Sequence, residues 1–107
     1  FVHSFDPCCY LYLSRSMDLF DAFGGKDTLA GAFAGLRLDS AHVIGVETDI
    51  LFPLHQQREL ADALEANGIR TRFDALPSLQ GHDAFLVDYG RFNPAVARCF
   101  EAMSETC

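Results

Sequence analysis

The middle of the chain carries two strand-like patterns separated by a helical one. Val43, Ile44 and Val46 form a short apolar run, which is typical of a buried parallel strand. Residues 53–68 show the apolar spacing of an amphipathic helix that begins near a proline and ends in an Asn-Gly pair. Residues 69–76 alternate between apolar and polar, which indicates a half-buried strand near a sheet edge. A strand, a helix and a strand joined by short connections predict a right-handed parallel crossover.

Helical patterns flank this unit on both sides. Before it, Asp6 and Pro7 can cap and begin a helix that runs towards a Gly-Gly pair at 24–25, and a second short helix is expected within 26–36. The first helix is apolar round most of its surface, so we expect it to be buried on more than one side. After the unit, residues 93–103 predict a helix packed on the sheet through an apolar stripe at helical spacing, made of Val96, Cys99, Phe100 and Met103.

The predicted order is helix, helix, strand, helix, strand, loop, helix, which is an α/β pattern. Two strands make a thinner sheet than an open α/β domain normally has. We therefore expect one end of a larger domain. The chain begins with Phe1 rather than Met, which agrees with a fragment or a processed piece.

Composition and charge narrow the range of partners. The chain has 107 residues, of which 50% are hydrophobic and 21% charged, as expected for one small globular domain. Its formal net charge of −7 argues against nucleic acid and anionic membrane surfaces, which need clustered Lys and Arg. No apolar run approaches the roughly 20 residues that cross a bilayer. We expect neither nucleic acid nor a membrane as a partner.

The cysteines point to a reducing compartment. They form no C-x-x-C pair, and the histidines stand at no zinc-ligand spacing from them. Two adjacent and two distant thiols make a weak disulfide framework, so we expect a cytoplasmic protein without a metal site. These thiols are Cys8, Cys9, Cys99 and Cys107.

Two candidate catalytic residues follow the two predicted strands. Asp49 lies just past the first strand, and His82 lies in the loop after the second, within a Gly-His-Asp sequence. Functional groups of open α/β sheets gather beyond the carboxyl ends of the strands, so we expect both residues at one edge. An aspartate beside Nδ1 of a histidine fixes the tautomer and stabilises the imidazolium, while the other nitrogen acts as a base. A plain loop histidine and a helix-capping aspartate remain the alternative.

The nucleophile that such a pair would serve is missing. An acid followed by a histidine is the order of the last two members of the serine triad in α/β-hydrolases. The chain contains no G-x-S-x-G, and none of its serines follows a strand in the required elbow. Cys8 or Cys9 is a weaker candidate, because both precede an apolar helix instead of following a strand.

Three segments resemble the homoserine O-acetyltransferase family of α/β-hydrolases. "ETDILFPLHQQRELADAL" resembles the family's acid segment, "GHDAFLVD" its histidine segment, and "FDPCCYLYLSRSMDLFD" the helical region before the acid strand. The three motifs stand in the family order and cover nearly the whole chain. The resemblance implies the C-terminal part of an α/β-hydrolase fold, with a helical lid-like segment at 1–38 and a βαβα part at 39–107.

The same resemblance implies an activity and the residues that perform it. Enzymes of this family transfer an acetyl or succinyl group from acyl-CoA to the hydroxyl of L-homoserine or L-serine through an acyl-serine, in methionine or cysteine biosynthesis. Asp49 would orient His82 as the catalytic base, and Asp83 would bind the ammonium of the acceptor. Acyl-CoA is a co-substrate, no further cofactor is implied, and the full-length enzyme is expected to be a homodimer. Donor and acceptor stay open, as do two alternatives: an esterase of the same fold, and a truncated module without catalysis.

Overall fold

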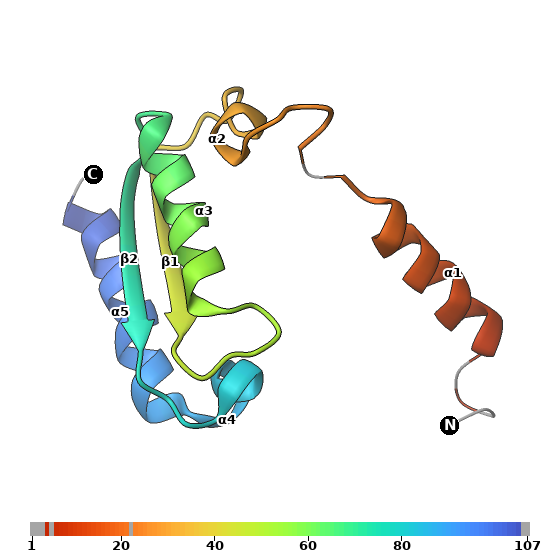
Figure 1. Ribbon diagram of the computed structural model, residues 1–107. Helices are drawn as coiled ribbons and strands as arrows, with labels where there is room; N and C mark the ends of the chain where they lie inside the picture. The colour runs from red at the N-terminus through yellow and green to blue at the C-terminus, as the bar shows by residue number, and fades with distance from the viewer. Residues whose placement is uncertain (1–3, 5, 22, 106–107) are drawn as a thin grey trace.

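The computed structural model describes residues 4, 6–21 and 23–105. They form a small α/β unit preceded by two helices, the second of which lies against the unit (Figure 1). The elements follow the order α1 Pro7–Leu19, α2 Leu29–Ala32, β1 Ser40–Val46, α3 Leu54–Ala66, β2 Arg70–Leu76, the 3₁₀ turn η1 Gly81–Asp83, α4 Ala84–Val87 and α5 Tyr89–Glu105.

The two strands pair in parallel, with Ser40 opposite Arg70 at one end and Val46 opposite Leu76 at the other. Figure 1 shows α3 on one side of this sheet and α5 on the other. The predicted strand, helix, strand unit with parallel pairing is therefore confirmed, and so is the α/β class. Both strands deliver their carboxyl ends to the same edge of the sheet.

The hydrophobic core lies between the sheet and α3. It consists of Val43, Ala61, Leu64 and Ile69, with partly buried neighbours that include Phe73. The sheet and α3 approach each other closely at Gly45 of β1, where an added Cβ atom would lie 2.6 Å from a methyl carbon of Leu54. Burial of these apolar side chains is the main source of stability for the unit. It also fixes the position of α3 relative to both strands.

The helix α5 packs with a different face from the predicted one. Ala95 is fully buried, whereas Val96 and Phe100 are 41% and 63% exposed. The prediction that Val96 and Phe100 belong to the face of this helix that packs on the sheet is therefore wrong. A small side chain at Ala95 allows the helix backbone to approach the sheet, and the hydrophobic pattern gave too much weight to the large residues. The helix also begins at Tyr89, four residues before the predicted segment.

The first helix departs most from expectation. It is capped by Asp6, whose side chain accepts the N–H of Cys8, as predicted, but it ends at Leu19 and contains no buried residue. Figure 1 shows α1 set apart from the sheet. The expected burial on more than one side is thus wrong for this chain, because no described element packs against these apolar side chains. Among the described residues, no helix has both the length and the apolarity needed to cross a membrane.

Candidate functional site

Asp49 and His82 meet beyond the carboxyl ends of the two strands. The Nδ1 atom of His82 lies 3.1 Å from Oδ2 of Asp49. The other carboxylate oxygen accepts the backbone N–H groups of Leu51 and Phe52, each at 2.9 Å. The Asp49 side chain is 10% exposed and that of His82 34% exposed. The carboxylate is therefore fixed on both oxygens, while the imidazole remains open to approach.

The electrostatics of Asp49 keep it ionised. Its pKa lies below the ordinary value of 3.8, chiefly because the N–H of Phe52 donates to the carboxylate. Desolvation raises the pKa in opposition, and the hydrogen bonds from His82 and Leu51 add to the lowering. An ionised carboxylate at Nδ1 favours the tautomer with the proton on Nδ1, which leaves Nε2 as the basic nitrogen.

Aromatic rings surround the imidazole. The rings of Phe52 and Phe85 meet that of His82 edge-on, with centroids 5.0 and 6.2 Å away. The same rings line an open cavity of about 270 Å³, together with Asp49 and Phe92. A histidine held between apolar rings, beside a cavity, is placed to exchange a proton with a group bound there.

Thr48 ties the loop of His82 to the strand end of Asp49. Its hydroxyl donates to the backbone carbonyl of Ser78 at 2.7 Å and accepts the N–H of Gly81 at 3.0 Å. Gly81 has a φ of +63°, a conformation that favours glycine. Sequence reasoning missed Thr48. A hydroxyl residue directly before the acid, in the "ETD" that follows the strand, was the available signal.

A second polar cluster holds the other side of the loop. The hydroxyl of the fully buried Ser78 donates to Asp88 at 2.6 Å, and Arg91 donates to the same oxygen at 2.9 Å. The Ser78 hydrogen bond is the main reason why the pKa of Asp88 lies below its ordinary value. The loop between β2 and η1 is thereby joined to the start of α5. The sequence analysis assigned no role to either residue of this pair.

Asp83 lies beside His82 in η1 and its side chain is exposed. It occupies the position before α4, but its side chain makes no capping hydrogen bond. The Asp83 carboxylate therefore does not cap α4.

The cysteines of the described residues lie away from the Asp49–His82 pair. Cys8 and Cys9 are exposed on α1, away from the sheet (Figure 1), and Cys99 lies half-buried on α5. His3 and Cys107 fall outside the described residues. Within the described part of the chain, no group of three or more His, Cys, Asp and Glu side chains is placed to hold a metal ion.

The chain thus contains a parallel α/β unit with an aspartate and a histidine paired beyond its strand ends, which is how the acid and the base of a serine triad are arranged relative to each other. Curated proteins resemble the chain in sequence. The chain is 55% identical over 105 residues to a serine O-succinyltransferase of Stenotrophomonas maltophilia, covering 96% of the chain and 28% of that protein. Relatives with the same name from Xylella fastidiosa (strain M12) and Xanthomonas campestris pv. campestris (strain B100) are 55% and 54% identical over 90% of the chain. No family model matches the chain.

These relatives confirm the resemblance to the homoserine and serine O-acyltransferases, and the chain is a homologue of that family. It spans little more than a quarter of their length, 26 to 28% in the three proteins.

The role of Thr48 can be tested without an activity assay. Thr48→Val keeps the shape of the side chain but removes both hydrogen bonds, whereas Thr48→Ser keeps the hydroxyl. We expect the Gly81 amide to exchange its hydrogen about five- to tenfold faster in the valine variant, since one hydrogen bond contributes about 1 kcal/mol. NMR-detected exchange measures this. Equal exchange in the valine and serine variants would contradict the role.

The lowered pKa of Asp49 predicts a pH dependence of stability. A carboxylate whose folded pKa is depressed stabilises the fold above its ordinary value of 3.8, and this contribution is lost as the pH falls through the folded value. We expect the free energy of unfolding of Asp49→Asn to be lower than that of wild type at neutral pH and to decline less below about pH 4. Denaturant titrations from pH 7 to pH 2 measure both curves, with Asp62→Asn as control on the exposed side of α3. Parallel curves for wild type and Asp49→Asn would refute the prediction.

Proposed function

We propose that this chain is the C-terminal part of an acyl-CoA-dependent O-acyltransferase, and that the intact enzyme transfers a succinyl group to the hydroxyl of L-serine. The observation that carries the proposal is the Asp49–His82 pair, 3.1 Å apart, in a chain about 55% identical to serine O-succinyltransferases. The names of these relatives favour succinyl over acetyl and serine over homoserine.

In the proposed mechanism His82 moves one proton in each half-reaction. It takes the hydroxyl proton of the nucleophilic serine as that oxygen attacks the thioester carbonyl, and it returns the proton to the departing CoA sulfur. In the second half it takes the proton of the acceptor hydroxyl, which attacks the acyl-serine, and then reprotonates the serine. Asp49 stabilises the imidazolium throughout. The nucleophile and the oxyanion-binding groups belong to the part of the intact enzyme outside this chain.

We assign the selection of the acceptor to Asp83. Its exposed carboxylate follows His82 directly in η1. An anion beside the catalytic base attracts the ammonium of an amino acid and thereby brings its hydroxyl near the base. Water carries no such cation. Asp83 is therefore the residue that separates amino-acid acylation from simple ester hydrolysis.

The fold belongs to the same proposal. Residues 39–107 form the C-terminal βαβα part of an α/β-hydrolase domain, and residues 1–38 form a lid-like segment. Two features of the structure support it. The sheet of the described residues has two strands. The helix α1 presents large apolar side chains to solvent, among them Tyr12 and Met17, which are 77% and 76% exposed. Further strands, and a partner copy against the helical segment, would cover both surfaces in a homodimeric enzyme.

The catalytic roles are tested by substitution in the intact enzyme. We expect Asp49→Asn and His82→Ala each to reduce kcat/KM for succinyl-CoA and L-serine by about three orders of magnitude or more, as in serine triads. His55→Ala is the matched control, because His55 lies exposed on α3. A steady-state assay of CoA release measures the rates. Near-normal turnover in either dyad variant would refute the assignment.

The transferase and esterase alternatives are separated by Asp83→Asn. We expect this variant to raise KM for L-serine by about tenfold or more, because a charge-assisted contact is lost, while acylation of the enzyme by the donor stays unchanged. Single-turnover measurement of CoA release isolates the acylation step. If the variant and wild type hydrolyse simple esters equally, and neither is accelerated by L-serine or L-homoserine, the enzyme is an esterase.

A further inference from the structure

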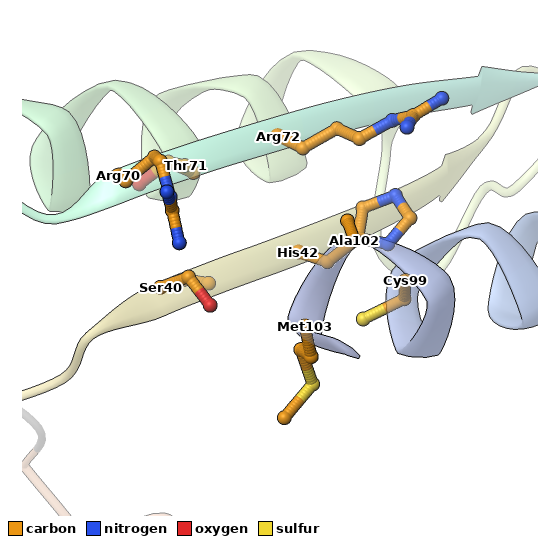
Figure 2. Close-up of a pocket in the computed structure, with 9 residues that line it drawn as sticks. Ser40, His42, Arg70, Thr71, Arg72, Cys99, Ala102 and Met103 are labelled. Carbon is orange, nitrogen blue, oxygen red and sulfur yellow. The ribbon is translucent and has the colours of Figure 1, made fainter. Parts of the chain in front are cut away.

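A second pocket lies at the opposite end of the strands from His82. It has a volume of about 370 Å³ and is formed between α5 and the start of the sheet. Figure 2 shows Ser40 and His42 rising from β1, Arg70 and Arg72 from β2, and Cys99 and Met103 from α5. None of these residues takes part in the proposed acyl transfer.

His42 is the buried polar group of this pocket. Its side chain is 6% exposed, and its Nε2 donates to Oδ2 of Asp74 at 2.7 Å. Its other nitrogen, Nδ1, is buried without a hydrogen-bond partner among the described residues. Figure 2 shows the ring between Arg72 and the helix turn that bears Cys99. A buried ring nitrogen without a partner is costly, so a bound group that satisfies it would be retained.

The surrounding charge selects the kind of group. Nε of Arg72 and Nη2 of Arg98 lie 3.5 and 3.7 Å from the Asp74 oxygen that His42 also contacts. Burial raises the pKa of Asp74, but the hydrogen bond from His42 and the charges of the two arginines outweigh it, and the pKa lies below 3.8. The side chain of Asp74 is therefore an ionised carboxylate with one negative charge.

Arg70 and Arg72 both line the pocket, and no carboxylate is among its lining residues. The pocket wall therefore carries positive charge, in a chain whose formal net charge is −7.

We propose that this pocket binds the oxyanion group, carboxylate or phosphate, of a small organic anion. The oxyanion accepts hydrogen bonds from the guanidinium groups of Arg70 and Arg72, and a protonated oxygen of the ligand donates to Nδ1 of His42, whose Nε2–H stays on Asp74. Arginine suits such groups because its planar fork matches two oxygens. Ala102 and Met103 give the pocket an apolar wall against which the rest of the ligand packs.

A metal ion fits these charges less well. The imidazole held by a carboxylate and the thiol of Cys99 are possible ligands for a soft cation. However, the arginines at the same pocket repel a cation and attract an anion. Electrostatics therefore decides for the anion, and zinc serves as the contrary probe.

The test is calorimetric titration of the intact protein with inorganic phosphate and, separately, with butyrate. We expect wild type to bind at least one of them, and Arg70→Gln and His42→Phe each to weaken that affinity by about tenfold or more. Arg58→Gln is the matched control, because Arg58 lies on α3 against the Phe73 ring and its loss removes the same charge from the opposite face of the sheet. Arg70→Gln changes an exposed residue and keeps the test valid if His42→Phe fails to fold.

Each outcome decides the proposal. Binding of phosphate alone supports a phosphate-bearing ligand, and binding of butyrate alone supports a carboxylate with an apolar chain. The proposal is overturned if wild type binds neither phosphate nor butyrate. It is also overturned if Arg58→Gln weakens the anion affinity as much as Arg70→Gln does. Binding of Zn²⁺ that is lost in Cys99→Ser, without binding of either anion, would show a metal site instead. His82→Ala should leave anion affinity unchanged, so the result is independent of the proposed acyl transfer.

Discussion

The parallel hydrogen-bonded ladder between β1 and β2 is the constraint on which the candidate site depends. Because the strands run in the same direction and in the register that sets Val46 opposite Leu76, both carboxyl ends reach one edge together. The ladder continues one step further, where the N–H of Glu47 donates to the carbonyl of Leu76 at 3.0 Å. A one-residue slip would move the loop of His82 relative to Asp49 and turn every side chain of the strand to the other face.

The same ladder divides the chemistry between two faces. The α3 face is apolar and contains Val43 and Phe73, which gives the unit its core. The α5 face carries the ion pair of His42 and Asp74, cross-strand neighbours of Arg72 and Ile44 respectively. The helix α5 adds to this face through Arg98, whose Nη2 lies 3.7 Å from Oδ2 of Asp74. The charged groups of this face therefore come from both strands and from the helix that covers it.

Local patterns were sufficient to predict the strands, the helix between them and the positions of Asp49 and His82. These features depend on period, turn residues and the edge rule for parallel sheets. The phase of α5 was not predictable in this way, because the largest apolar residues of its stripe, such as Phe100, are exposed. Thr48, Ser78 and His42 were missed for another reason. Their partners lie 30, 10 and 32 positions away, so the contacts exist only once the register is known.

The geometry of the acid–histidine pair is held by groups within this chain. Asp49 is fixed by two backbone N–H groups of its own loop, and the loop of His82 is fixed by Thr48 on one side and by the Ser78–Asp88 contact on the other. None of these hydrogen bonds requires a group from the remaining three quarters of a protein the size of its relatives. If the proposed function holds, the base and its orienting carboxylate are preorganised by their own fold. The rest of the enzyme then has to bring the nucleophile and the acyl donor to a site that is already set, which lowers the ordering cost of catalysis.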